Sequence, residues 1–338
     1  MKFAYLFPGQ GAQYSGMALD FLVSDAVKSL FNTASEIFGK DVKEILNADA
    51  EVLKRSEVAQ PAITVANLAA AAYLGEHGYS PAACAGFSLG EYAALVCAGI
   101  IDTKDCLRLV KVRGEAMQTA ADRLREAALQ NSNTAGEALA APGMAAVVGL
   151  APAQVEELIA KWKEEAKAAA SVTAAINDLY AANINSPKQL VISGTAAALT
   201  EAEKLFKDAG ARRVIRLQVA GPFHSPLMVE SLRTFLPELE KVTFRNPSIP
   251  IFSNVTGKAI TCGAEAKELT IKHITNPVRW VEEESVIAAS GIQACLEVGP
   301  GSVLQGLWKD VGSVIPVFAA GTVEDIDKLK EKISGEKI

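Results

Sequence analysis

Short apolar runs alternate with longer helical patterns along the 338-residue chain. The first run, at residues 3–7, is uninterrupted and predicts a buried strand, and a second at residues 82–85 predicts another. Similar runs follow in the last third of the chain, at residues 249–253, 295–298 and 314–319. Because helical patterns separate these strands, we expect a parallel α/β sheet with helices packed on it.

The middle of the chain has a different order of elements. It predicts strand, helix, strand, strand, helix and strand, at residues 144–150, 152–170, 180–184, 189–193, 200–209 and 213–219. A capping box of Thr200 and Glu203 is expected to open the second helix. This β-α-β-β-α-β order is the ferredoxin-like split motif. We therefore expect a small domain at residues 141–219, inserted into a larger domain formed by residues 1–140 and 220–338.

The pentapeptide Gly86-Phe87-Ser88-Leu89-Gly90 lies between the predicted strand at 82–85 and a predicted helix at 91–98. A G-x-S-x-G sequence in this context is the pattern of a nucleophile elbow. Its glycines permit a turn sharp enough to expose the serine hydroxyl, and the helix start offers free N–H groups to an oxyanion. A chance match is the alternative, because small residues are common in strand-to-helix turns. The pattern favours acyl chemistry at Ser88.

A serine nucleophile needs a base, which is usually histidine, and the chain has three histidines. His77 lies at a predicted helix end, where an exposed structural role is expected. His224 follows a strand in a Gly-Pro-Phe-His-Ser-Pro loop, whose two prolines fix the backbone on either side. His273 lies at the end of another helix. By elimination His224 is the expected base and His273 the second candidate, and with no obvious third carboxylate we expect a Ser–His dyad.

Arg113 is placed unusually for a charged residue. On a helix its neighbours three and four positions away are all apolar: Leu109, Val110, Ala116 and Met117. The guanidinium is therefore expected on the buried side of that helix. One interpretation is a snorkelling side chain or a structural ion pair, and the other is an arginine held to bind a substrate anion.

Several loops are expected at one edge of the parallel sheet. Residues 8–13 follow the first strand and contain two glycines with Gln10 and Gln13, which suits the rim of a site, although a surface turn is the alternative. Glycine-bearing loops at 254–257 and 297–301 follow later strands, where α/β sites usually lie. Residues 119–141, by contrast, predict a helix extension and then a flexible loop without chemistry.

The composition excludes several classes of function. Half of the residues are hydrophobic and the net charge is −6, which argues against a nucleic-acid or membrane-surface binder. The five cysteines form no C-x-x-C pair, as expected for reduced thiols in a cytoplasmic protein. No signal-peptide core or membrane-length apolar run is found, nor a phosphate-binding loop, dinucleotide fingerprint or metal-ligand cluster. We expect a soluble cytoplasmic monomer with no cofactor and no metal.

Taken together and in this order, the motifs resemble a known family. The motifs span almost the whole chain and comprise residues 7–11, 86–91, Arg113 with Met117, 185–187, 221–224, 276–280 and 297–301. The resemblance is to malonyl-CoA:acyl-carrier-protein transacylases and the related acyltransferase domains of fatty-acid and polyketide synthases. It implies an α/β-hydrolase-like domain with a ferredoxin-like insertion, in agreement with the strand order predicted above.

The resemblance also implies roles for individual residues. Ser88 would be the nucleophile, His224 the base, and Arg113 the partner of the free malonyl carboxylate, with the backbone N–H groups of Gln10 and Leu89 forming an oxyanion hole. Expected substrate contacts are Arg113, Gln10, Phe223, Met117, His273 and Asn185. Malonyl would pass from malonyl-CoA to Ser88 and then to the phosphopantetheine thiol of an acyl carrier protein. Coenzyme A is then a substrate and not a bound cofactor.

Three departures from the family pattern and three rival functions accompany this expectation. Phe87 stands where the family usually has histidine, His273 where it often has glutamine, and the 119–141 segment is longer than usual. The rivals are a serine hydrolase or thioesterase, a trans-acting polyketide-synthase acyltransferase, and a non-enzymatic subunit that docks a carrier protein.

Overall fold

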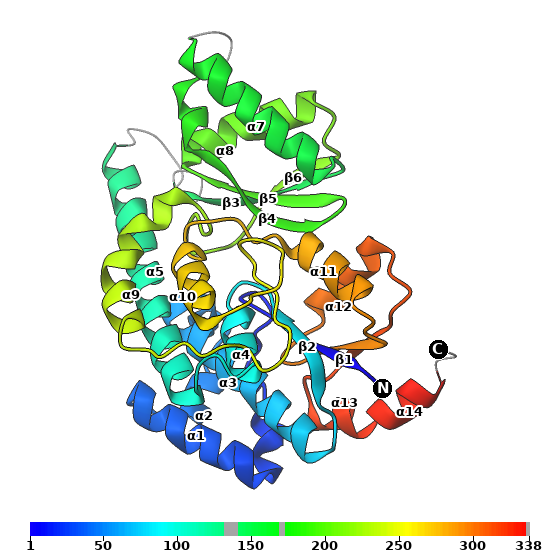
Figure 1. The fold of residues 1–338 in the computed structure, drawn as a ribbon. Helices are drawn as coiled ribbons and strands as arrows, with labels where there is room; N and C mark the ends of the chain where they lie inside the picture. The colour runs from blue at the N-terminus through cyan, green and yellow to red at the C-terminus, as the bar shows by residue number, and fades with distance from the viewer. Residues whose placement is uncertain (132–140, 169–172, 336–338) are drawn as a thin grey trace.

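Two four-stranded β-sheets organise the chain in the computed structural model, which describes residues 1–131, 141–168 and 173–335 (Figure 1). The larger sheet is parallel and has the order β2-β1-β7-β8. Its strands are β1 (Phe3–Phe7), β2 (Pro81–Gly86), β7 (Ala294–Glu297) and β8 (Val317–Ala319). The expected parallel α/β sheet is therefore confirmed, and β1, at its centre, is buried along its whole length.

The second sheet is antiparallel and has the order β4-β5-β3-β6. Its strands are β3 (Gly143–Val148), β4 (Leu179–Ser186), β5 (Gln189–Gly194) and β6 (Arg213–Arg216), and α7 (Pro152–Lys167) and α8 (Ala196–Asp208) pack on it. The predicted order of strands and helices is confirmed. This unit lies at the top of Figure 1 and has its own core, in which Trp162 and Phe206 meet edge to face with ring centroids 4.7 Å apart.

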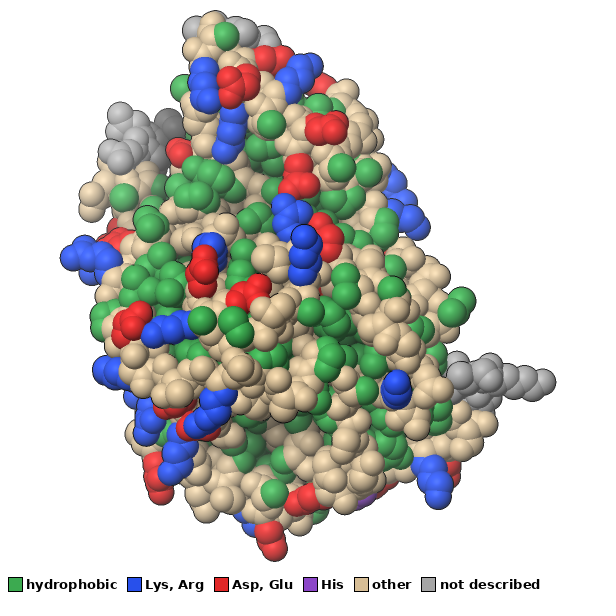
Figure 2. All heavy atoms as spheres, in the orientation of Figure 1, with side chains coloured by type: hydrophobic (Ala, Val, Ile, Leu, Met, Phe, Trp, Pro, Cys, Tyr) green, Lys and Arg blue, Asp and Glu red, His purple; other side chains and the backbone are tan. Residues whose placement is uncertain are grey.

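In the described part of the chain, eight further helices lie with the parallel sheet in the part of the molecule below the second sheet (Figure 1). They are α1 (Asp25–Phe38), α2 (Val42–Leu46), α9 (Leu232–Leu239), α10 (Gly263–Lys272), α11 (Trp280–Ala289), α12 (Val303–Val311), α13 (Val323–Asp327) and α14 (Leu329–Gly335). Short 3₁₀ turns are η1 (Leu19–Val23), η2 (Val52–Lys54), η3 (Ala174–Asp178) and η4 (Pro226–Ser231). On the face shown in Figure 2, acidic and basic side chains are interspersed.

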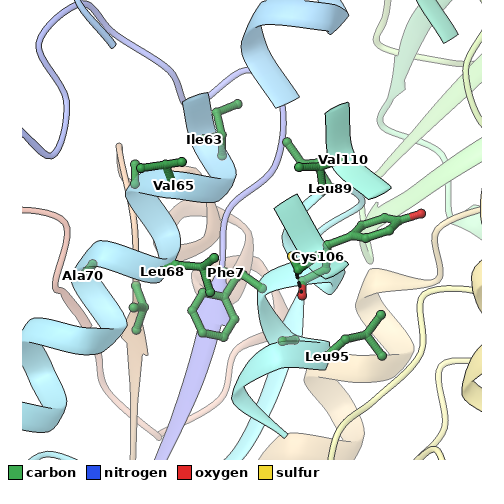
Figure 3. Packing of buried hydrophobic residues seen from close by; sticks show 14 of the residues in the cluster. Phe7, Ile63, Val65, Leu68, Ala70, Leu89, Leu95, Cys106 and Val110 are labelled. Carbon is green, nitrogen blue, oxygen red and sulfur yellow. Dashed lines mark hydrogen bonds between the residues drawn. The ribbon is translucent and has the colours of Figure 1, made fainter. Parts of the chain in front are cut away.

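Three long or buried helices meet at the carboxyl end of β1. They are α3 (Ser56–Glu76), α4 (Gly90–Cys97) and α5 (Thr103–Asn131). Figure 3 shows side chains from all three gathered around Phe7, the last residue of β1. Packing on this scale holds the loop after β1 and the loop after β2 in fixed positions beside each other.

The α3 helix corrects one expectation from the sequence. With 21 residues and an apolar window of mean hydropathy 1.2, it is long and apolar enough to cross a membrane. In the structure 78% of that window is buried inside the protein, as in the core helix of a soluble fold. The sequence predicts a long apolar helix from about Ala62, but not one of membrane length, because the apolar residues of α3 are mostly alanines and are broken by Gln60 and Asn67.

Other predicted elements differ in their bounds. The α8 helix begins at Ala196, with Thr195 as the N-cap that accepts from the N–H of Ala198, so the capping box predicted at Thr200 and Glu203 is wrong. Residues 249–253 make only isolated bridges, one of them from Ile251 to β2. The predicted helix extension after residue 119 is confirmed to the end of α5, and the flexible loop predicted after it lies largely outside the described residues.

Candidate active site

Ser88 lies in the turn between β2 and α4, with a φ of +49°. The glycines on either side are required by close backbone contacts. A Cβ at Gly86 would lie 2.0 Å from the carbonyl carbon of Gly90, and a Cβ at Gly90 would lie 2.0 Å from the carbonyl oxygen of Phe7. The sharp strand-to-helix turn expected of a nucleophile elbow is therefore present, and it packs directly against the end of β1.

Ser88 and His224 form a hydrogen-bonded pair. The Oγ of Ser88 donates to Nε2 of His224 over 2.7 Å. On the other side of the ring, Nδ1 of His224 donates to the backbone carbonyls of His273 at 3.1 Å and Asn276 at 3.3 Å. Because carbonyl oxygens only accept, the proton is on Nδ1 and Nε2 is free to take the serine proton. The expected dyad, oriented by neutral acceptors in place of a carboxylate, agrees with this geometry.

The surroundings of His224 keep its ring neutral. Burial lowers the pKa of His224, and the positive charge of Arg113 lowers it further, while the two backbone carbonyls act in the opposite direction; the result is a pKa of about 4. A histidine that stays uncharged at neutral pH is in the form that can act as a base.

Arg113 is buried with only part of its hydrogen-bonding capacity used. Its Nη1 donates to Oε1 of Gln60 over 2.8 Å, and its guanidinium lies over the ring of Tyr92. Nε and Nη2 have no partner, and no carboxylate lies within ion-pair distance of Arg113 among the described residues. A buried guanidinium with unpaired N–H groups is costly unless an anion meets it, which favours the anion-binding interpretation over a structural ion pair.

Close helix packing positions this arginine. The next residue on α5, Gly114, lies against α3 so tightly that a Cβ there would be 2.6 Å from the carbonyl oxygen of Ser56. This contact brings Arg113 within reach of Gln60 on α3. The predicted apolar neighbours of Arg113 are all buried: Leu109, Val110, Ala116 and Met117.

The pair and the arginine line one cavity of about 190 Å³. Its walls come from the elbow and α5 on one side and from β3, β4 and β5 on the other, so it lies where the second sheet faces the elbow. Eight of the predicted site residues line it: Gln10, Ser88, Leu89, Arg113, Met117, Asn185, Phe223 and His224. Asn183, Gln218 and Lys54 also line it and had not been singled out from the sequence.

Two backbone N–H groups beside Ser88 are free to donate. Within the described part of the chain, neither Gln10 N–H nor Leu89 N–H donates a hydrogen bond to another protein group. Leu89 stands at the start of α4, where backbone N–H groups carry positive partial charge. Gln10 and Leu89 both line the cavity, so these two N–H groups are the candidates for the expected oxyanion hole.

His273 was expected to contact substrate, and the structure corrects this. It is buried behind His224, with ring centroids 5.4 Å apart, and it does not line the cavity. Burial and the charge of Arg113 lower the pKa of His273. Its backbone carbonyl accepts from His224, and its Nε2 donates to Oδ1 of Asn254 over 3.1 Å. The residue therefore supports the ring of His224 from behind.

Asn254 is a further residue of the site whose role the sequence analysis missed. Its Oδ1 accepts from the backbone N–H of Ser88 at 2.6 Å, and its Nδ2 donates to the carbonyl of Gly86 at 2.7 Å and to Glu283 at 2.8 Å. Its backbone N–H donates to Glu91. A glycine-bearing loop had been expected here, but the sequence around an asparagine in a loop does not indicate that the side chain will bond to residues far away in the chain.

Phe87 and the buried carboxyls complete the surroundings of the elbow. Phe87 lines the cavity and meets Trp280 edge to face, with ring centroids 5.4 Å apart. Burial raises the pKa of Glu91 to about 7 and that of Glu283 well above its usual range. Among the residues that the structure describes, no group of His, Cys, Asp and Glu side chains could hold a metal ion.

Comparisons with known proteins agree on one family. The model of the acyl transferase domain matches residues 4–177 and 163–323. A malonyl CoA-acyl carrier protein transacylase of Bacillus subtilis (strain 168) is 35% identical over 328 residues, covering 96% of this chain and 95% of the relative.

Solved structures with the same fold point the same way. An acyl carrier protein S-malonyltransferase of Vibrio cholerae has a TM-score of 0.83 and 34% identity, covering 97% of this chain and 100% of its own. A malonyl-transacylase solved in complex with its holo type II polyketide-synthase acyl carrier protein has a TM-score of 0.83 and 31% identity, covering 98% of this chain and 100% of its own.

Proposed function

The chain belongs to the acyl transferase family, with malonyl-CoA:acyl-carrier-protein transacylases as its relatives, and we propose that Ser88 is its nucleophile and His224 its general base. It is an acyltransferase that transfers malonyl from malonyl-CoA to an acyl carrier protein. The observation that carries the residue assignment is the 2.7 Å hydrogen bond from Ser88 Oγ to His224 Nε2, in a cavity that Arg113 also lines.

In the first half-reaction, Ser88 Oγ attacks the thioester carbonyl of malonyl-CoA as its proton passes to Nε2 of His224. The negative charge on the carbonyl oxygen is stabilised by the N–H groups of Gln10 and Leu89. The carbon–sulfur bond then breaks, the coenzyme A thiolate takes the proton from Nε2, and malonyl remains as an ester on Ser88. The imidazolium is stabilised while it exists by the His273 and Asn276 carbonyls at Nδ1.

In the second half-reaction, the phosphopantetheine thiol of the carrier protein attacks the malonyl ester. His224 now removes the thiol proton and then returns it to Ser88 Oγ as the ester bond breaks. Every proton moves through the same Nε2 atom, so the steps need no group beyond this chain and its two substrates.

Arg113 is proposed to select the malonyl group. Its unpaired Nε and Nη2 can donate two parallel hydrogen bonds to the free carboxylate. Met117, Phe223 and Asn185 are proposed as further contacts around the acyl chain, since each lines the same cavity.

The domain assignment is part of the proposal. We assign residues 1–140 and 220–338 to an α/β-hydrolase-like domain, supported by the parallel order β2-β1-β7-β8 and the elbow after β2. We assign residues 141–219 to a ferredoxin-like domain, supported by the order β4-β5-β3-β6. We also propose a cytoplasmic monomer that binds neither nucleic acid nor membrane, as the acidic net charge and five free thiols favour.

The experiment that tests this function separates transfer from hydrolysis. The protein is incubated with malonyl-CoA and holo acyl carrier protein, and malonyl-carrier and free malonate are quantified by mass spectrometry, with apo carrier as the matched control. We expect malonyl-carrier to form much faster than malonate, and none with the apo carrier. A predominance of malonate would identify a hydrolase or thioesterase, and absence of both products would identify a non-enzymatic docking subunit.

A further inference from the structure

Besides their direct hydrogen bond, Ser88 and His224 are connected by a second chain of hydrogen bonds that runs through His273 and Asn254. Ser88 Oγ contacts His224, His224 Nδ1 contacts the His273 carbonyl, His273 Nε2 contacts Asn254 Oδ1, and Asn254 Oδ1 contacts the Ser88 N–H. These four contacts form a closed ring of hydrogen bonds with lengths of 2.7, 3.1, 3.1 and 2.6 Å.

The donors and acceptors of this ring are fixed by their partners. The amide orientation of Asn254 follows from two backbone groups, because the Ser88 N–H can only donate to Oδ1 and the Gly86 carbonyl can only accept from Nδ2. Since Oδ1 of Asn254 is an acceptor, the proton of the His273 imidazole is on Nε2. Neutral His273 thus has its single N–H pointed at Asn254.

The backbones of Ser88 and His224 both have conformations that the surrounding structure must stabilise. Ser88 and His224 have φ values of +49° and +54°, in the left-handed region that residues other than glycine rarely adopt. Backbones in such conformations persist only where their surroundings over-determine them. Asn254 holds the Ser88 peptide directly, and through the His273 imidazole it holds the residue whose carbonyl orients His224.

Asn254 is itself fixed from two further sides. Its backbone N–H donates to Oε2 of Glu91 over 2.7 Å, and its Nδ2 donates to Oε1 of Glu283 over 2.8 Å. Asn254, Glu91, Glu283 and His273 are all buried, so water does not compete for these bonds.

We propose that Asn254 and the imidazole of His273 are positioning residues that set the distance and alignment between Ser88 Oγ and His224 Nε2. The inference rests on the proposed function and adds to it two residues that touch neither malonyl nor the thiol. It also assigns a purpose to the imidazole of His273, whose N–H donates to Oδ1 of Asn254.

A matched pair of variants at residue 273 tests the role of the imidazole N–H. His273→Phe keeps the backbone carbonyl and a planar ring but removes the donor, whereas His273→Gln keeps an N–H donor on a flexible side chain. We expect His273→Phe to lower kcat for malonyl transfer about tenfold, with KM for malonyl-CoA within about twofold of wild type. His273→Gln should retain most of kcat. His77→Phe, at the exposed end of α3, controls for loss of an imidazole.

A second variant keeps the test decisive if His273→Phe is poorly folded. Asn254→Ser shortens the side chain out of reach of His273, and its kcat should fall in the same way with KM little changed. In the double variant Asn254→Ser/His273→Phe the losses should be less than additive, because either change opens the same ring. Equal kcat in His273→Phe and His273→Gln, or additive losses in the double variant, would overturn the inference.

Mass measurement of the wild-type protein distinguishes failure of the positioning role from failure of the proposed function. If wild-type Ser88 takes up malonyl while both ring variants transfer at the wild-type rate, only the positioning role is lost. If wild-type Ser88 takes up no malonyl, the proposed function fails and this inference fails with it.

Discussion

The guanidinium of Arg113 lies 5.3 Å from the centroid of the Tyr92 ring, buried between α5 and the elbow helix α4. The ring covers the guanidinium, and Gln60 occupies only its Nη1. Nε and Nη2 are left without a partner in the described chain, and Arg113 lines the same cavity as Ser88. A carboxylate is the group that matches two such donors, and malonyl differs from acetyl by one carboxylate.

Replacing Arg113 should change which acyl group is accepted. Each charge-assisted hydrogen bond contributes about 1.5–3 kcal/mol, so losing two lowers kcat/KM for malonyl-CoA by roughly two to four orders of magnitude. For Arg113→Ala we expect that loss with acetyl-CoA unchanged or improved, and for Arg113→Lys a partial recovery, since lysine keeps the charge without the fork. The measurement is the ratio of kcat/KM for the two thioesters. If the ratio in Arg113→Ala equals that of the wild type, Arg113 has a structural role and does not select malonyl.

The two buried histidines should respond differently to alanine. His224→Ala removes the Nε2 atom that we propose as the general base, and we expect the transfer rate to fall by about 10²–10⁴. His273→Ala keeps the backbone carbonyl that accepts from Nδ1 of His224, so its loss should be much smaller. Single-turnover acylation with malonyl-CoA measures both. Equal losses would mean that the base is misassigned or that the two imidazoles act as one unit.

The pKa of His224 predicts the acid limb of the pH profile. A base works only while neutral, and with a pKa of about 4 the ring gains its proton only as the pH falls through that value. Acylation by p-nitrophenyl acetate should therefore be level from neutral pH down to about pH 5 and decline below it.

The same profile should shift when Arg113 is removed. Burial is the main reason that the pKa of His224 is low, and the charge of Arg113 is the second, so Arg113→Ala should raise that pKa and move the acid limb to higher pH. The acetate ester has no free carboxylate, which keeps the measurement independent of malonyl binding. An acid limb near the ordinary histidine value in both proteins would contradict the assignment.

The elbow glycine is expected to be intolerant of even one methyl group. In Gly90→Ala the new Cβ would meet the backbone oxygen of Phe7 at 2.0 Å, and overpacking of this kind costs about 1–3 kcal/mol of unfolding free energy. Gly75→Ala is the matched control, because no atom lies within 4 Å of its Cβ position in α3, and alanine there should be neutral or stabilising by about 0.5–1 kcal/mol. Urea denaturation compares the two. Similar stabilities would contradict the close contact.

The parts of the site that the sequence predicted are those with a local signature. The elbow is contiguous, Arg113 is marked by neighbours one turn away, and His224 is one of only three histidines. The role of Asn254 has no such signature, because its partners Ser88 and Gly86 are 166 and 168 positions away. His273 was noticed as a histidine, but its place behind His224 depends on how α10 packs, which the spacing does not reveal.

Two predictions of the fold were wrong for different reasons. The sequence predicts a cap at Thr200, whereas in the structure Thr195 caps the helix, which begins at Ala196. Residues 249–253 have strand-like composition, yet they bridge β2 at Ile251 alone and do not extend the sheet. In residues 249–253 the long-range arrangement of the chain therefore overrode the local preference.

The central claim is that malonyl passes through an ester on Ser88, and the mass of the protein tests it most directly. Wild type and Ser88→Ala are mixed with malonyl-CoA without carrier protein, and intact mass and peptide mapping are recorded. Ser88→Ala removes one oxygen from a turn that otherwise stays the same, so it should fold while acylation falls by about 10⁴–10⁶. We predict one malonyl group on wild type, located at Ser88 and released by holo carrier protein, and none on Ser88→Ala. A malonyl adduct on Ser88→Ala, or transfer to the carrier without any adduct on wild type, would contradict the account.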